Sequence, residues 1–282
     1  MHKDMIDSID HLIIAVENLE KAESNYQKIF GFPPVWKGDH EKLGTRNSIF
    51  NFSNTYIELL SASGKGVGAD FVSKVLSTQG EGLCGIALGT SNIEKIKTDL
   101  WQKGFANPLL SEGEGVNQKK SKFRRWKNLF LPVELMRGLF VFVIEHVEGE
   151  LPIKDVGDSG VRRLDHVVMN TADADKFIEV YREFFNMRLA LDTVIEHWGR
   201  RMLFFRVNKT TLEVIEKKDR ENDNDRLWGL AWEVENLDVA CERLILEGVE
   251  VSRIKNGLKK DTRVATIKSH NHNVPTILLE YT

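Results

Sequence analysis

The sequence predicts an α+β fold of four βαβββ modules in two pairs, each pair a curved half-barrel sheet with helices outside. Two observations support this prediction. His11 and Glu58 are 47 residues apart (58 − 11), as are His166 and Glu213 (213 − 166), and the two pairs are offset by 155 residues (166 − 11). Helix-like segments with similar starts also recur four times. Self-similarity of this kind is typical of a duplicated structural unit.

Each module is predicted to open with a β-branched apolar strand, IDHLIIAV in the first and LDHVVMNT in the third. Helices with apolar residues at three- and four-residue spacing follow. They start at Asn18, Asn92, Ala172 and Asn236. Asparagine is a favoured N-cap residue. Three of the helices end near a glycine, at Gly31, Gly104 and Gly248, whereas the third ends at Phe185 and Asn186.

Each module is predicted to close with an apolar strand that carries a glutamate at the same place. These glutamates are Glu58, Glu145, Glu213 and Glu280, in IEL, IEH, LEV and LEY. The modules are predicted to span 5–62, 80–148, 161–218 and 226–282. The Gly-, Asp- and Pro-containing segment 151–160 is interpreted as a linker between a 1–150 domain and a 161–282 domain.

Strand alternation predicts which side chains line the concave face of each sheet. His11 should share its face with Ile13 and Ala15, and Glu58 should share its face with Tyr56 and Leu60. A bare carboxylate inside such a cup carries a desolvation penalty of about several kcal/mol unless it is paired or bound to a metal. The repeated His and Glu therefore predict metal or acid–base sites in the cups.

Composition mainly excludes other classes of protein. The net charge of −3 and the pI near 6.3 give no reason to expect nucleic acid or an anionic membrane as partner. No apolar run approaches the roughly 20 residues that span a bilayer, and no signal region precedes the first strand. Cys84 and Cys241 lack disulfide-framework or metal-like spacing. A cytoplasmic location is expected.

Several segments resemble the vicinal oxygen chelate superfamily, which includes glyoxalase I, fosfomycin- and bleomycin-resistance proteins and extradiol dioxygenases. DHLIIAVENLEKA resembles its first strand and helix, and YIELL its metal-bearing last strand. GDHEKLGTRNSIF and FVFVIEH are similar to glyoxalase-like domains of unassigned function, and GLAWEVENLDVACERLILEGVEV to the closing module of bacterial members. The resemblance covers nearly the whole chain and is specific for fold, not for substrate.

The resemblance implies that metal ligands come from the first and last strands of paired modules. The two implied ligand sets are His11, Glu58 and Glu145, and His166, Glu213 and Glu280, with Gly85 and Gly229 at the fourth positions. One imidazole and two carboxylates suit a single divalent ion: Fe, Mn, Ni, Zn or Mg. Such an ion binds two vicinal substrate oxygens as a Lewis acid. Glu58 or Glu145, or the second-half counterparts Glu213 and Glu280, is the candidate to leave the metal and shuttle a proton.

Five further polar residues are candidates for the site. His40 and His197 are separated by 157 residues (197 − 40), close to the repeat, and could act as ligand or general base. Arg46, Asn47 and Arg201 are candidates to orient substrate oxygens, since arginine binds carboxylates in a bidentate manner.

The other histidines and the basic run are interpreted as structural. His146 follows Glu145, so alternation turns it away from the cup. SHNHN (269–273) is interpreted as a turn, and KKSKFRRWK (119–127) as a solvated hairpin. Contact of Arg124 or Arg125 with an anionic substrate is the alternative for that run.

The favoured function is a divalent-metal-dependent lyase or isomerase of the glyoxalase-like type, acting on a small oxygenated metabolite. An Fe(II) extradiol-type dioxygenase ranks lower, because such enzymes open each of their last two modules with a histidine and Gly229 opens the fourth module here. A metal-free small-ligand binding or resistance protein is the third hypothesis. The working cup is left open, and a homodimer is possible because dimers are common in this superfamily.

Overall fold

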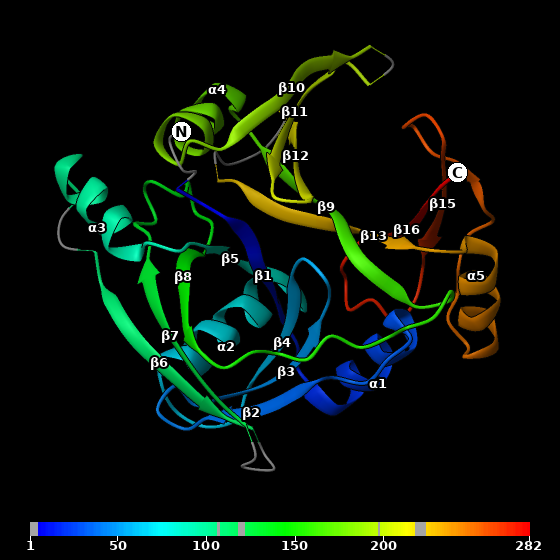
Figure 1. The fold of residues 1–282 in the computed structure, drawn as a ribbon, viewed down its shortest axis with the longest axis horizontal. Helices are drawn as coiled ribbons and strands as arrows, with labels where there is room; N and C mark the ends of the chain where they lie inside the picture. The colour runs from blue at the N-terminus through cyan, green and yellow to red at the C-terminus, as the bar shows by residue number, and fades with distance from the viewer. Residues whose placement is uncertain (1–4, 106–107, 118–121, 197, 218–223) are drawn as a thin grey trace.

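The structure is a computed structural model that describes residues 5–105, 108–117, 122–196, 198–217 and 224–282. The chain forms two eight-stranded sheets, one from each half (Figure 1). The predicted α+β fold of four βαβββ modules is confirmed.

The two halves contain matching elements. The first half comprises β1 (Ser8–Ala15), α1 (Leu19–Phe30), β2 (Trp36–His40), β3 (Thr45–Asn51), β4 (Tyr56–Ala62), α2 (Val67–Gln79), β5 (Gly82–Gly89), α3 (Ile93–Gln102), β6 (Leu110–Val116), β7 (Phe123–Phe130) and β8 (Val141–Glu148). The second half comprises β9 (Val161–Thr171), α4 (Ala174–Ile178), a π-helical turn (Glu179–Phe184), β10 (Arg188–Ile195), β11 (Arg200–Val207), β12 (Thr210–Glu216), β13 (Arg226–Val234), α5 (Leu237–Leu246), β14 (Lys255–Asn256), β15 (Thr262–Ile267) and β16 (Thr276–Tyr281).

The strand order is the same in both sheets. It is β2-β3-β4-β1-β5-β8-β7-β6 in the first and β10-β11-β12-β9-β13-β16-β15-β14 in the second. The opening strands β1 and β9 lie near the middle, parallel to the last strand of their own module and antiparallel to the first strand of the next. In the first sheet the outer strands β2 and β6 also contact each other, so that sheet nearly closes into a barrel.

Three helices have the predicted asparagine caps, and α4 begins two residues after the predicted start at Ala172. The side chains of Asn18, Asn92 and Asn236 each accept a hydrogen bond from the backbone N–H three residues later. Asp173 caps α4 in the same way. These caps satisfy backbone donors that a first helical turn otherwise leaves without partners.

Helix α2 is not among the helices predicted from the sequence. It follows β4 and packs on the concave side of the first sheet, where Val72 and Val75 lie in one apolar cluster with Ile13, Leu60 and Phe142. Figure 1 shows α2 lying within the curve of this sheet. The helix therefore fills part of the first cup.

The two halves share one continuous apolar core. Trp232 of β13 is fully buried, and its ring packs against Phe30 and Phe52 of the first half at centroid distances of 5.2 and 4.4 Å. The side chain of His272 is 5% exposed and bonds to Glu81 and Asn25 of the first half, so the SHNHN segment has a structural role, as predicted.

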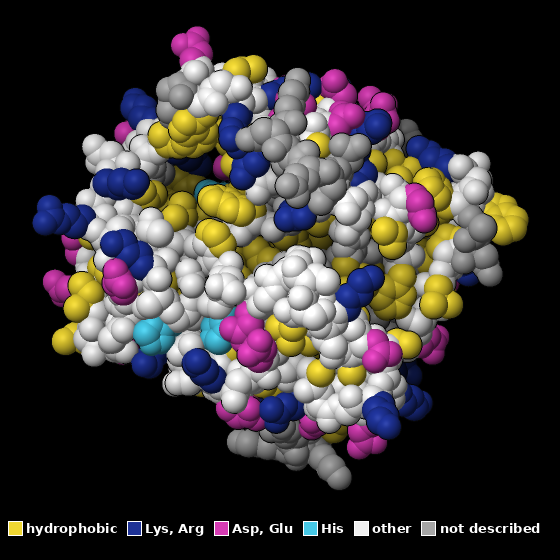
Figure 2. Space-filling model, turned by 180° about the vertical axis from the view of Figure 1, so that it is seen from behind, with side chains coloured by type: hydrophobic (Ala, Val, Ile, Leu, Met, Phe, Trp, Pro, Cys, Tyr) yellow, Lys and Arg dark blue, Asp and Glu magenta, His cyan; other side chains and the backbone are white. Residues whose placement is uncertain are grey.

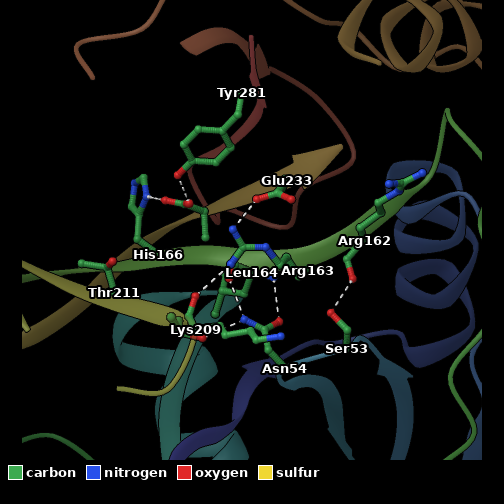
Figure 3. Close-up of polar contacts among 12 residues, drawn as sticks. Ser53, Asn54, Arg162, Arg163, Leu164, His166, Lys209, Thr211, Glu233 and Tyr281 are labelled. Atoms are coloured by element: carbon green, nitrogen blue, oxygen red, sulfur yellow. Dashed lines mark hydrogen bonds and ion pairs between the residues drawn. The ribbon is translucent and has the colours of Figure 1, made fainter. Parts of the chain in front are cut away.

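Asn54 forms a polar link between the halves (Figure 3). Its Nδ2 donates to the Leu164 carbonyl and the Thr210 hydroxyl, both at 2.8 Å, and its Oδ1 accepts from the Leu164 N–H. We expect Asn54→Ala to lower the free energy of unfolding by about 1–3 kcal/mol, because buried backbone groups lose their partners. Urea denaturation would measure this. Ser53→Ala is the matched control, with a loss below about 0.5 kcal/mol; equal losses in the two variants would contradict the assignment.

Two predictions about the chain as a whole can be compared with the structure. No helix in the part of the chain that the structure describes is both long and apolar enough to cross a membrane. Cys84 and Cys241 are both free thiols, as expected.

Candidate functional site

An Asp–His–Glu arrangement lies at the centre of the first sheet. The β1 register shifts between Ile9 and His11, which leaves Asp10 without a partner in the β5 ladder and places its carboxylate beside the imidazole. His11 Nδ1 donates to Asp10 at 2.7 Å, and His11 Nε2 faces Glu58 at 3.6 Å. As predicted, His11 shares the concave face with Ile13, since its ring lies 5.5 Å from that of Phe142, which belongs to the same apolar cluster as Ile13. The first cup thus contains a histidine between two carboxylates.

The second sheet repeats this arrangement. His166 Nδ1 donates to Asp165 at 2.8 Å, and His166 Nε2 faces Glu213 at 3.7 Å. The β13–β9 register shifts at the same place, between Leu164 and His166. Tyr281 of β16 donates to the second oxygen of Asp165, as Figure 3 shows. The Asp–His–Glu set is therefore duplicated with its geometry intact.

The two aspartates are held in the charged form. Burial alone would raise the pKa of Asp10, but hydrogen bonds from His11 and His146 outweigh it and hold the pKa below its usual range. Burial likewise opposes the charge of Asp165, yet hydrogen bonds from His166 and Tyr281 lower its pKa to about 2. An ionised carboxylate accepts only, so each histidine keeps a proton on Nδ1.

A neutral imidazole protonated on Nδ1 presents a lone pair on Nε2. In both cups Nε2 lies 3.6 or 3.7 Å from a glutamate oxygen, too far for a hydrogen bond. Two ligands that lie about 2.1 Å from one ion at 90–120° are about 3.0–3.6 Å apart. A carboxylate behind the second ring nitrogen is also the usual support of a metal-bound histidine. The His11–Glu58 distance lies at the upper end of this range and the His166–Glu213 distance lies 0.1 Å beyond it, so a small side-chain movement would let each pair bind one divalent ion.

The ladder positions opposite the two histidines add no third ligand in either cup. The ladder pairs His11 with Ala87 and His166 with Ala231, whereas Gly85 and Gly229 pair with Ile13 and Val168. Within the described ranges, no group of three or more His, Cys, Asp or Glu could hold a metal ion. The residues present fit two positions of a divalent ion and leave the others for water and substrate oxygens.

The expectation that Glu145 and Glu280 line the cups is wrong. Glu145 accepts from the Ile93 N–H at the start of α3, and Glu280 accepts from the Leu237 N–H at the start of α5. Both therefore lie on the outer, helix-bearing faces. A shift of one residue along a strand moves a side chain to the other face. For the same reason His146, expected outside, lies in the first cup and bonds to Asp10 at 2.8 Å.

Arg46 and Arg201 also lie outside the cups, contrary to expectation. Arg46 pairs with Glu20 of α1 at 2.6 and 2.9 Å, and Arg201 pairs with Asp175 of α4 and with Asp192. Hydrogen bonds to these two aspartates raise the pKa of Arg201. Both arginines connect a helix to its sheet and do not face a substrate in the cup.

The remaining candidates differ in position. Asn47 lies in the first cup and donates to Glu58 at 2.6 Å. His40 bonds to Thr45 at the end of β2. Thr45 is four residues along β3 from Ile49, the partner of Glu58, or about 13 Å at strand spacing. The structure therefore does not bring His40 to Glu58, and His197 lies outside the described residues.

Four residues of the two sites were missed: Asp10, Asp165, His146 and Tyr281. The first two had a signal, since an aspartate directly precedes each histidine in IDH and LDH. Strict alternation turns that aspartate to the outer face. Only the register shift beside each histidine brings it back into contact with the ring.

The two cups differ in access to solvent. His11 is 3% exposed and stacks on Tyr56, while α2 fills one part of its cup. His166 and Glu213 are 18% and 19% exposed. Burial raises the pKa of Glu213. Figure 2 shows a hollow flanked by hydrophobic side chains over the C-terminal half. The second cup is the more accessible of the two.

Comparison with known proteins agrees with this architecture. A family described as the glyoxalase-like domain matches residues 9–185, and the glyoxalase/bleomycin resistance protein/dioxygenase superfamily matches residues 163–273. A mutant of 4-hydroxymandelate synthase from Streptomyces coelicolor has a TM-score of 0.72 at 13% identity, over 98% of this chain and 93% of that chain.

Two other solved structures have similar folds. A Mn(II)-bound glyoxalase from Novosphingobium aromaticivorans has a TM-score of 0.64 at 13% identity, over 99% of this chain and 83% of that chain. A hypothetical protein from Staphylococcus aureus has a TM-score of 0.66 at 13% identity, over 96% of this chain and 98% of that chain. At this identity the likeness shows the fold alone. The search of curated proteins found no match.

Proposed function

Since this chain belongs to the glyoxalase-like domain family of the vicinal oxygen chelate superfamily, we propose that it is a divalent-metal-dependent lyase or isomerase whose reaction site is the C-terminal cup. Its substrate would be a small oxygenated metabolite. The observation that carries the proposal is the His166 Nε2 and Glu213 pair, 3.7 Å apart in a cup that solvent reaches.

Four residues of the second cup would have distinct roles in this reaction. His166 and Glu213 would hold the ion, and Asp165 keeps the His166 proton on Nδ1 so that Nε2 is free to bind. Tyr281 fixes Asp165 through its second oxygen. When bound, the ion would act as a Lewis acid toward two vicinal oxygens of the substrate. Glu213 is then the carboxylate placed to take a proton from the neighbouring carbon and return it.

A metal-binding experiment with matched variants tests the proposal. Because one neighbour is a Mn(II)-bound glyoxalase, Mn²⁺ is the first ion to titrate into metal-free protein, with Fe²⁺, Ni²⁺, Zn²⁺ and Mg²⁺ after it. We expect one site per chain that His166→Gln abolishes and His11→Gln retains. Binding of none of these ions, or loss in His11→Gln alone, would overturn the assignment to the second cup.

Proton transfer provides the second test. Small α-hydroxy carbonyl compounds incubated in D₂O are expected to exchange the proton next to the carbonyl only with metal present. Exchange should fall by about 10²–10⁴-fold in Glu213→Gln, the usual contribution of a positioned general base. Exchange that is independent of both metal and Glu213 would contradict the lyase or isomerase assignment.

The residues around His166 make dioxygenase chemistry less favoured than lyase or isomerase chemistry. An extradiol-type dioxygenase site of two histidines and one carboxylate would need a second histidine near His166, and the ladder places Ala231 there. Oxygen uptake with a catechol and Fe²⁺ would reverse this ranking. A metal-free ligand-binding protein would bind its ligand equally well after His166→Gln.

A further inference from the structure

Arg124 of β7 is a buried arginine inside the first sheet. It is 5% exposed, and its guanidinium carbon lies 5.7, 5.5 and 5.6 Å from the ring centroids of Trp36, Tyr56 and Trp126. The three rings come from β2, β4 and β7, and β2 contacts β6, the neighbour of β7, where the sheet nearly closes into a barrel. The expectation of a solvated hairpin is wrong at this residue.

This cation has no counter-ion in the described part of the chain. None of the ion pairs there includes Arg124, and its Nε is buried without a hydrogen-bond acceptor. The next residue, Arg125, faces outward and pairs with Glu148. Arg124 also hydrogen-bonds to the side chain of Tyr56. Tyr56 is a phenol and neutral at pH 7, so it attracts the cation without neutralising it. A buried charge without a counter-charge costs about several kcal/mol, so its retention calls for an anion.

The space around the guanidinium is built by glycines of β6. A Cβ atom at Gly113 would collide with the Trp126 indole, and one at Gly115 would lie 3.3 Å from both Trp36 and Trp126. Alternate glycines on one face of a strand thus make room for two indoles that stand inside the sheet. The Trp36–Trp126 box, formed by these two indoles around the guanidinium, therefore depends on residues of β2, β6 and β7.

The same cup contains further polar atoms without partners. Asn128, four residues after Arg124 and on the same face of β7, has a buried Oδ1 with no hydrogen-bond donor, and so does Asn47 of β3. Native structures leave few buried polar atoms unsatisfied. Buried acceptors without donors, in the same cup as a guanidinium whose Nε has no acceptor, point to a ligand that carries both an anionic group and a hydroxyl or amine donor.

We propose that the first cup is a second ligand site, in which Arg124 binds the carboxylate of a small monocarboxylate. A flat carboxylate suits a guanidinium bordered by flat rings, because the two form parallel hydrogen bonds in one plane. Asp10 and Glu58 already bring negative charge into this cup. This negative charge would repel a phosphate dianion more strongly than a monoanion, and Arg124 would be the direct partner of the bound carboxylate. This site is independent of the metal proposed for the second cup.

The test uses the full chain and defined probes. Thermal unfolding and tryptophan fluorescence would be followed with acetate, lactate, pyruvate, benzoate and, for comparison, inorganic phosphate. We expect at least one carboxylate to raise the melting temperature by several degrees at saturation and to change the emission of the Trp36–Trp126 box. A shift with phosphate alone, or with no probe, would overturn the proposal.

Three variants separate binding from folding. Arg124→Met keeps the bulk of the side chain without charge, and we expect it to weaken carboxylate binding at least 100-fold while ligand-free stability is kept or increased. Arg124→Lys keeps the charge without the planar fork and should weaken binding about tenfold. Arg125→Met should bind as the natural chain does.

Two outcomes identify the other roles of this arginine. If Arg124→Met and Arg124→Lys both melt far below the natural chain and carboxylates protect none of the proteins, Arg124 only joins the strands through its aromatic contacts, and the proposal fails. His166→Gln should leave carboxylate binding unchanged. Loss of carboxylate binding in that variant would instead place the ligand in the second cup and overturn the assignment to Arg124.

Discussion

Replacing Trp232 with alanine is expected to lower the free energy of unfolding by about 3–5 kcal/mol, the usual cost of removing a buried tryptophan. Trp232 is fully buried on β13, and its ring meets Phe52 at 4.4 Å and Phe30 at 5.2 Å. These contacts join the two halves. The variant should therefore lose the packing between the sheets along with the burial of one side chain. Urea unfolding followed by circular dichroism measures the change.

Trp228 is the matched control because it lies on the same strand and is 46% exposed. Its replacement by alanine should change stability by less than about 0.5 kcal/mol. The continuous core also predicts one cooperative transition for the natural chain. A loss below about 1 kcal/mol in Trp232→Ala, or two separate transitions in the natural chain, would show that the halves fold independently.

Most of the fold follows from local pattern. The alternation around His11 and Glu58 placed both on the concave face, because a strand has a period of two and this part of β1 and β4 keeps it. The asparagine caps likewise depend on neighbouring residues only. Helix α2 also has a local pattern, with buried residues at 69, 72 and 75. That pattern shows an apolar face without showing that the face packs inside the sheet.

The errors at the candidate site come from the register of single residues and from the closure of the first sheet. Glu145 sits in an apolar strand like Glu58, yet it stands on the outer face because its position along the strand is shifted. Asp10 enters the cup because of a register shift that no local pattern reveals. Arg124 lies in a basic run, and only the approach of β2 to β6 encloses it. Such features depend on contacts between distant strands.

Replacing Asp165 with asparagine is expected to weaken Mn²⁺ binding in the second cup by about 10–100-fold, the usual cost of removing a carboxylate that supports a metal-bound histidine. Asp165 accepts from His166 Nδ1 at 2.8 Å and from Tyr281. An amide is neutral and offers donors as well as an acceptor. The imidazole would then be free to carry its proton on Nε2, where the ion must bind. Isothermal titration of metal-free protein with Mn²⁺ measures the affinity.

Asp10→Asn is the matched control, because Asp10 supports His11 in the same way at 2.7 Å but in the first cup. If the second cup holds the metal, Asp10→Asn should leave Mn²⁺ affinity unchanged while Asp165→Asn reduces it. Equal losses in both variants would mean that both cups bind metal, and a loss in Asp10→Asn alone would move the reaction site to the first cup. The two Asp–His–Glu sets have nearly the same geometry and differ in access to solvent. This pair of variants therefore tests whether the more accessible set is the one that binds the metal.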